Sequence, residues 1–274
     1  MGKGTLVVLG GGGCRAIEAH IGMLKAMEEA GIKPTNYRGA SAGAIVSGFH
    51  ASGLTADLMQ GLIEANPTSK LWGTDWRLYV PGLTCYDVYK CDGLDKLIAD
   101  NVDERQTLAK VTVSVTRRPD EKVKTAQSLL IPGSIWGIQM SKAMPEIFPI
   151  VTSPEGWEGN DGGVLNNVPV VSIAESQDWD HIYILLCNDG IDGSLTSGLK
   201  VHRALEWFLL TMDRETQDVK DEWTGLPNVT ILQPPAYDSG LLEWSDGFGL
   251  VKHAHDYAKA ALATNDNESE IKTA

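Results

Sequence analysis

The sequence contains few basic residues for its length. It has 23 lysines and arginines against 36 aspartates and glutamates in 274 residues, which gives a formal net charge of 23 − 36 = −13. The phosphates of nucleic acids and of anionic lipid headgroups repel a chain of this charge. We therefore expect no nucleic-acid partner, and we expect any peripheral contact with a membrane to depend on apolar side chains.

Long hydrophobic runs are also missing. No segment reaches the roughly 18 apolar residues that a membrane-spanning helix needs. The first apolar run, residues 5–9, is too short for the hydrophobic part of a secretory signal peptide. We predict a cytoplasmic protein that contacts membranes only peripherally.

Cysteine is scarce as well, with four residues: Cys14, Cys85, Cys91 and Cys187. None of them forms a C-x-x-C pair or a Cys/His spacing typical of a zinc site. Without an export signal, free thiols are favoured over a Cys85–Cys91 disulfide. The pattern predicts no structural metal, and we expect activity without one.

What the sequence does contain is a regular alternation of strand-like and helix-like segments. This alternation predicts one three-layer α/β/α domain over residues 1–274, with a mainly parallel central sheet and a polar, frayed tail at 264–274. Strands are expected at 5–10, 36–41, 110–118, 122–130, 181–188 and 228–235. Helices are expected at 16–30, 42–52, 55–66 (with Thr55 as N-cap), 92–102, 134–144, 201–223 and 247–263.

A run of glycines follows the first strand and opens the first helix. Residues 11–16, Gly-Gly-Gly-Cys-Arg-Ala, fit the dinucleotide-binding pattern G-x-G-x-x-G/A in the right local context. That interpretation also requires an acidic residue at the end of the second strand, to bind the ribose. The second strand instead ends in Tyr37, Arg38 and Gly39, so nucleotide binding stays only an alternative.

The next motif is Gly39-Ala40-Ser41-Ala42-Gly43, which is G-x-S-x-G between a strand and a helix. This is the context of a nucleophile elbow, a sharp turn that presents the serine hydroxyl. Gly39 and Gly43 leave room for the close approach of the flanking segments. Ser41 is therefore a candidate nucleophile, with a simple helix N-cap as its structural alternative.

A nucleophilic serine needs groups that stabilise the oxyanion. Because adjacent parallel strands end side by side, the glycine run is expected to lie next to Ser41. Backbone N–H groups of Gly11, Gly12 and Gly13 then form a candidate oxyanion hole, where one donor contributes about 10²- to 10³-fold in rate. Within the same loop, Cys14 follows the glycines, and Arg15 either fixes the loop, adds positive charge, or forms a surface ion pair.

The base is less well defined by the pattern. The six histidines are His20, His50, His181, His202, His253 and His255, and the last two suit the Ser…Asp…His order of an α/β-hydrolase triad. The acidic candidate is Asp161, followed by Gly162 and Gly163. Its structural alternative is an Asx turn.

Taken in order, these motifs resemble those of the patatin-like phospholipase family: G-G-G-x-[KR]-G, then G-x-S-x-G, then D-G-[GA]. The resemblance covers roughly residues 4–187 and includes the flanking stretches 20–32 and 140–151; Ala16 replaces the usual last glycine of the first motif. It implies a Ser–Asp dyad in which Ser41 forms an acyl-enzyme and Asp161 is the general base. It also implies a phospholipid or other lipid ester as substrate, phospholipase A-type hydrolysis, and no cofactor.

Two alternatives remain beside this hypothesis. One is a Ser-His-Asp α/β-hydrolase esterase, which is disfavoured because only two strands precede Ser41. The other is a non-catalytic lipid- or nucleotide-binding protein. An aromatic stretch is expected to form a lid or a flap over the core, with Trp72, Trp76, Tyr79, Tyr86 and Tyr89.

Overall fold

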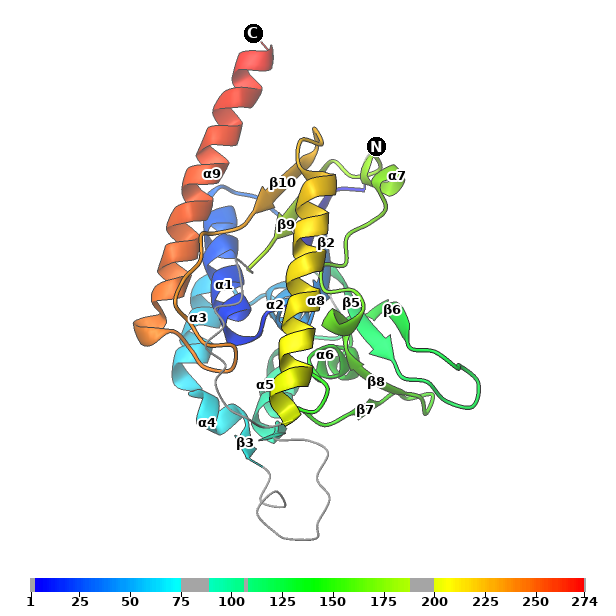
Figure 1. The fold of residues 1–274 in the computed structure, drawn as a ribbon. Helices are drawn as coiled ribbons and strands as arrows, with labels where there is room; N and C mark the ends of the chain where they lie inside the picture. Colours follow the sequence, from blue (N-terminus) through cyan, green and yellow to red (C-terminus); the bar gives the residue numbers. More distant parts are fainter. Residues whose placement is uncertain (1–2, 75–88, 106–107, 188–199, 274) are drawn as a thin grey trace.

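The computed structural model describes residues 3–74, 89–105, 108–187 and 200–273, and the side chains of these ranges except 200–209 and 265–273. Figure 1 shows their arrangement. Most of the expected aromatic lid, Trp76, Tyr79 and Tyr86 included, lies outside these residues. Among the described residues, no helix combines the length and the apolar character needed to cross a lipid bilayer.

A mixed sheet forms the centre of the molecule. Its strands follow the order β10-β9-β1-β2-β5-β8-β7, and β6 also pairs with β5. The first five are parallel, whereas β5/β6, β5/β8 and β7/β8 are antiparallel. The bounds are β1 Thr5–Leu9, β2 Asn36–Ala40, β5 Lys110–Arg117, β6 Gln127–Pro132, β7 Val151–Thr152, β8 Glu158–Asp161, β9 His181–Leu185 and β10 Val229–Leu232; β3 Gly73–Thr74 and β4 Tyr89–Lys90 form a separate pair.

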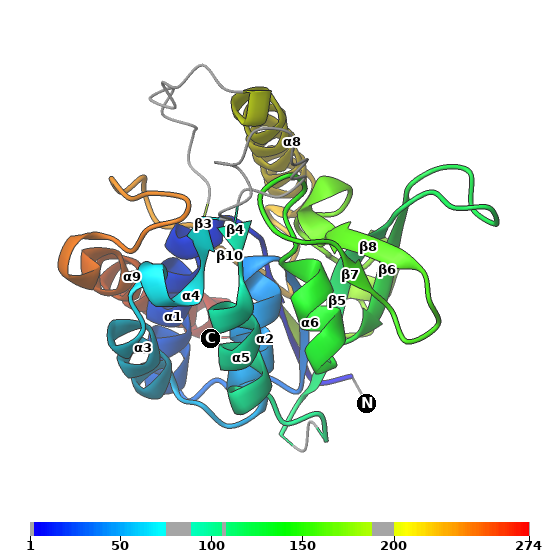
Figure 2. The same cartoon turned by 90° about the horizontal axis from the view of Figure 1, so that it is seen from below.

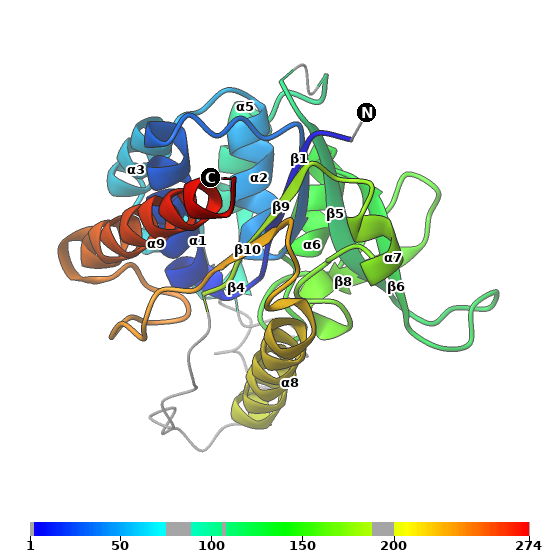
Figure 3. The same cartoon turned by 90° about the horizontal axis from the view of Figure 1, so that it is seen from above.

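Helices cover both faces of this sheet. They are α1 Gly13–Glu29, α2 Ala42–Ala51, α3 Ala56–Ala65, α4 Thr68–Leu71, α5 Asp92–Asn101, α6 Ile135–Ser141, α7 Ile173–Ser176, α8 Lys200–Trp223 and α9 Gly249–Thr273, with 3₁₀ turns η2 Gly162–Val164 and η3 Asp246–Phe248. Figures 2 and 3 show α1, α2, α3, α5 and α9 on one side of the sheet and α8 on the other.

The two-sided core explains why four consecutive residues of β1, Leu6 to Leu9, are apolar. In β1, Val7 and Leu9 pack into the large cluster shared with α1, α2 and α9, whereas Leu6 and Val8 face the cluster that includes Trp223 of α8. A strand buried on both faces reads as a continuous apolar run. The expected three-layer α/β/α architecture is thereby confirmed.

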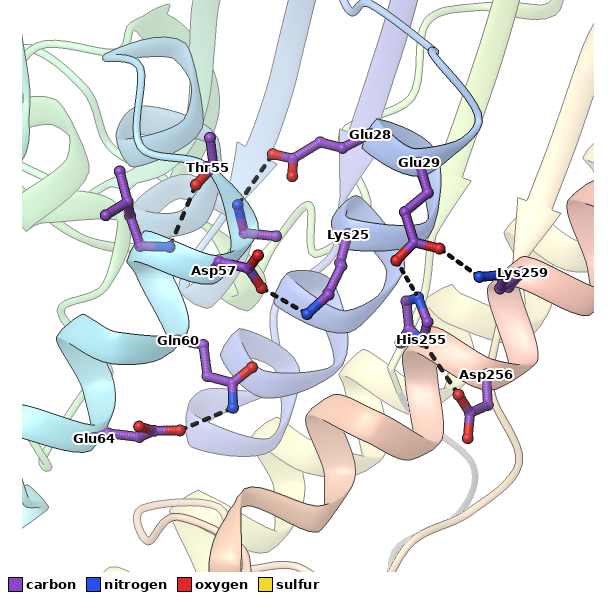
Figure 4. Close-up of polar contacts among 12 residues, drawn as sticks. Lys25, Glu28, Glu29, Thr55, Asp57, Gln60, Glu64, His255, Asp256 and Lys259 are labelled. Atoms are coloured by element: carbon purple, nitrogen blue, oxygen red, sulfur yellow. Dashed lines mark hydrogen bonds and ion pairs between the residues drawn. The ribbon is translucent and has the colours of Figure 1, made fainter.

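Polar contacts fix the C-terminal end of α1 to its neighbours on both sides (Figure 4). Glu28 accepts from the backbone N–H of Ala56 and so caps the start of α3. Glu29 forms a hydrogen bond with His255 and an ion pair with Lys259, both of α9. These contacts hold α1 in register, and the other end of α1 begins at the glycine run.

Some boundaries differ from the expected ones. Helix α1 begins at Gly13, within the glycine run, instead of at residue 16. Helix α6, expected at 134–144, ends at Ser141 rather than just before Pro145. The last helix extends to Thr273 instead of fraying after residue 263. The residues after Gly249 include no glycine or proline, so nothing in the local sequence ends this helix.

Candidate active site

The turn from β2 into α2 places Ser41 in a strained backbone conformation. Its φ is +53° and its ψ is −120°, a region that non-glycine residues rarely adopt. A Cβ on Gly39 would lie 2.5 Å from the carbonyl oxygen of Gly43, and one on Gly43 would lie 2.2 Å from that of Leu9. Both glycines are therefore required by the close packing of α2 against β1 and β2.

Ser41 and Asp161 contact each other directly. The Ser41 hydroxyl donates a hydrogen bond of 2.7 Å to Oδ2 of Asp161, which is fully buried. The other carboxylate oxygen accepts from the backbone N–H of Gly163 at 2.7 Å, and the Asp161 N–H donates to Ala143. Asp161 ends the short strand β8, whose partner β5 sets its position.

Burial changes the acidity of this carboxyl group. Desolvation raises the pKa of Asp161 to about 7, although the hydrogen bonds from Ser41 and Gly163 and the charge of Lys142 act in the opposite direction. A carboxylate whose pKa lies near neutral pH is suited to accept a proton and to return it. The pair therefore combines a hydroxyl with an adjacent base.

The glycine run lies beside this pair, as the parallel pairing of β1 and β2 requires. Gly12 and Gly13 have φ values of +149° and +68°, which favour glycine. The Gly11 N–H donates to Asn167 and the Cys14 N–H donates to Leu241. No described residue accepts a hydrogen bond from the N–H of Gly12 or Gly13, so these two are the donors left for a ligand.

Two residues that the motifs did not single out support this geometry. Ser141 accepts a hydrogen bond of 3.0 Å from the Ser41 N–H and donates one of 2.6 Å to the carbonyl of Ser114, so it fixes the turn to β5. Asn167 binds the Gly11 N–H through its side-chain and backbone oxygens. A single serine at the end of a helix carries no sequence signal. Asn167 belongs to the stretch Asn-Asn-Val-Pro at residues 166–169, and its contact with the glycine run arises only when the chain folds.

The histidines whose side chains are described have other partners. His20 is fully buried, donates to the carbonyl of Gly10, and has its pKa lowered to about 4 by desolvation. His50 contacts Tyr37 and Glu28 at the far end of α2. His181, His253 and His255 bond to Thr230, Pro235 and Glu29 respectively. The side chain of His202 lies outside the described part of the chain.

Lys142 is the charged residue that acts on Asp161 from the α6 side. It is 3% exposed, forms an ion pair of 3.0 Å with Asp95, and donates to the sulfur of Cys91. A buried lysine is stable only when it is paired in this way. Its charge favours the ionised form of Asp161.

The three described cysteines are free thiols. Cys14, Cys91 and Cys187 are free, and burial raises the pKa of each thiol. Cys85 lies outside the described residues, as does any pairing that involves it. Within the described residues, no group of three His, Cys, Asp or Glu side chains is arranged to hold a metal ion. Arg15 is half-buried in the first turn of α1.

A small apolar cavity lies behind the site. It holds about 20 Å³ and lies among helices α1, α2, α3 and α5, two of which begin at the glycine run and at Ser41. It is lined by Ile17, Ile21, Ile45, Val46, Phe49, Met59, Ile63, Leu71, Trp72, Leu94, Leu97 and Trp244. A larger cavity of about 340 Å³ lies away from the site, beside β10 and the end of α8.

Comparison with known proteins gives a consistent result. The sequence model of a family described as patatin-like phospholipase matches residues 7–173. An uncharacterized NTE family protein of Mycobacterium bovis is 26% identical over 179 residues, which are 61% of this chain and 45% of that protein. A lysophospholipase nte1 of Emericella nidulans is 41% identical over 177 residues, 62% of this chain and 11% of that protein.

Among solved structures, VipD from Legionella pneumophila shares the fold. Its TM-score is 0.52 at 15% sequence identity, and the match covers 96% of this chain and 67% of that chain. The chain spans less than half the length of the two curated relatives named above.

Proposed function

The chain belongs to the patatin-like phospholipase family, and from this premise we propose that it hydrolyses carboxylic esters of lipids as a phospholipase A-type acyl hydrolase. The observation that carries the proposal is the 2.7 Å hydrogen bond from the Ser41 hydroxyl to the buried carboxylate of Asp161. The substrate class, a phospholipid or another lipid ester, follows from the family.

In the proposed reaction, Ser41 Oγ attacks the ester carbon while Asp161 accepts the hydroxyl proton. The carbonyl oxygen becomes an oxyanion that the N–H groups of Gly12 and Gly13 stabilise. The C–O bond to the leaving group then breaks, and Asp161 returns its proton to the departing alkoxide. Ser41 remains acylated until Asp161 takes a proton from a water molecule, which attacks the acyl carbon. The bond between the acyl carbon and Ser41 Oγ then breaks, Asp161 returns the proton to Oγ, and the fatty acid is released.

The apolar cavity behind the site supports a lipid substrate. Its lining is apolar throughout, and Ile17 and Ile45 lie one turn into the helices that begin beside the oxyanion donors and at the nucleophile. At about 20 Å³ it has room for about one water-sized group. An acyl chain therefore enters only as these side chains move apart.

Serine labelling tests the proposal. A fluorophosphonate reacts with an activated serine, so we expect it to label the wild-type chain and not Ser41→Ala. Ser47→Ala is the matched control, because Ser47 is a buried serine of the same helix whose hydroxyl bonds only to the carbonyl of Ala44. A folded wild-type chain that neither labels nor hydrolyses a lipid ester would support the non-catalytic alternative.

The same assays separate the dyad from a triad. Asp161→Asn is expected to be nearly as damaging as Ser41→Ala, because an amide cannot accept the serine proton. His253→Ala and His255→Ala are expected to keep substantial activity. If a histidine variant stays folded and loses activity as completely as Ser41→Ala, the α/β-hydrolase triad replaces the dyad.

A further inference from the structure

Asn167 is held rigidly between α8 and the glycine run. Its backbone N–H donates a hydrogen bond of 2.7 Å to Glu215 of α8, and the N–H of Val168 donates to the other oxygen of the same carboxylate at 3.1 Å. On its other side, Asn167 accepts from the N–H of Gly11, at 3.2 Å with its carbonyl oxygen and at 3.1 Å with Oδ1. The residue is 1% exposed.

These contacts fix which way the carboxamide points. The two ends of an asparagine side chain look alike in shape, and only hydrogen bonding distinguishes them. The Gly11 N–H is a donor, so the atom facing it is the oxygen, and Nδ2 lies on the opposite branch. Nδ2 is buried and has no hydrogen-bond partner among the residues that the structure describes. A buried donor without a partner is costly, and native proteins rarely keep one.

The side chain also lies close to the nucleophile. A Cβ built on Gly11 would be 2.4 Å from Oδ1 of Asn167 and 3.0 Å from the Cβ of Ser41. Gly11 therefore separates the two side chains by little more than the width of one methyl group. The absence of a side chain at Gly11 is what lets Asn167 Oδ1 and the side chain of Ser41 approach the same glycine.

We propose that Asn167 is a catalytic residue whose Nδ2 donates a hydrogen bond to an ester oxygen of the bound substrate. Its Oδ1 at the same time positions Gly11, so that the neighbouring N–H groups of Gly12 and Gly13 face the same substrate. Glu215 acts as a positioning residue because it holds the backbone of Asn167. No bond to Asn167 forms or breaks in the reaction. This inference rests on the ester hydrolysis proposed above.

Two substitutions separate the donor from the acceptor. Asn167→Asp keeps an oxygen for the Gly11 N–H but replaces the donor, whereas Asn167→Leu keeps the branching at Cγ and removes both. We expect each to lower the pH-independent plateau of kcat by about 10²-fold or more on a lipid ester, with kcat expressed per folded molecule so that a loss of stability is not counted as a loss of turnover. Asn166→Asp is the matched control: it adds the same charge one residue away and is expected to leave kcat unchanged.

The pH dependence of kcat separates the loss of the donor from the effect of the charge that Asn167→Asp adds. If Asn167→Asp acted only by raising the pKa of Asp161, its activity would recover at higher pH, and recovery to the wild-type plateau would overturn the proposal. Loss in Asn167→Leu with full activity in Asn167→Asp would likewise leave only the positioning of Gly11 and overturn it. A wild-type chain that is not labelled at Ser41 would overturn the proposed function and this inference together; normal labelling of Asn167→Asp would overturn this inference alone.

Discussion

The buried carboxyl group of Asp161 sets the pH range expected for the proposed dyad. Because desolvation raises its pKa to about 7, the base is half-protonated near neutral pH. We expect kcat/KM to fall as the pH drops through about 7 and to be constant above it. This acidic limb lies close to the usual histidine pKa of about 6.5, so its position alone does not identify the base. The temperature dependence of the acidic limb does identify the base, because a carboxyl group ionises with little enthalpy and an imidazole with much more. If Asp161 is the base, the pH of this limb should barely change on heating.

The same shift predicts that Asp161 destabilises the fold. The unfolded carboxyl group ionises near pH 4, whereas the folded one keeps its proton up to about pH 7. The unfolded state therefore binds fewer protons between these values, and stability falls as the pH rises through that window. Asp161→Asn stays neutral and keeps partners for Ser41 and Gly163. Its Tm is expected to exceed that of the wild type at pH 8, by more than at pH 5; an equal or lower Tm at pH 8 would contradict the shift.

A substitution of Lys142 tests the charge contribution that lowers the pKa of Asp161. Its charge lowers the pKa of Asp161, so Lys142→Met is expected to move the acidic limb of kcat/KM to higher pH. Methionine fills a similar volume, and the Asp95 side chain, which is 35% exposed, is then free to turn toward water. Lys252→Met on the exposed face of α9 is the control, and its limb should not move. A limb that stays in place or moves to lower pH in folded Lys142→Met would contradict this assignment.

At the scale of elements, the glycine run is where a strand, a tight loop and a helix meet. Gly12→Val places a branched side chain at a φ of +149°, beside the oxyanion donors proposed above. We expect it to reduce turnover far more than it reduces stability. Gly31→Val is the matched control: it also has a positive φ, but a Cβ there meets nothing within 4 Å, so it should lose stability and keep turnover per folded molecule. Near-normal turnover of Gly12→Val would place the oxyanion donors elsewhere.

The sequence predicts these elements unevenly, for physical reasons. β1, β2 and the Thr55-capped helix α3 carry strong local signals, and the hairpin of β5 and β6 was expected near its observed place. The pair β7/β8 has only short, mostly polar strands, and tertiary pairing with β5 decides its structure. Ser41, Asp161 and the glycines stand out because chemistry demands their types. Ser141, Asn167 and Lys142 matter through contacts that only the folded chain creates.

At the scale of the whole molecule, the net charge bears on the proposed action on lipid surfaces. With a formal charge of −13, it is repelled by anionic vesicles unless salt screens the charges. The Debye length falls from about 30 Å at 0.01 M to about 8 Å at 0.15 M ionic strength. We therefore expect hydrolysis of anionic phospholipid vesicles to speed up over this range, while hydrolysis of zwitterionic vesicles changes little.

A soluble monomeric ester, measured at the same salt concentrations, controls for effects on the chemistry itself. A rate on anionic vesicles that falls with salt would show that a local basic surface outweighs the net charge, and contact through apolar side chains alone would then be wrong.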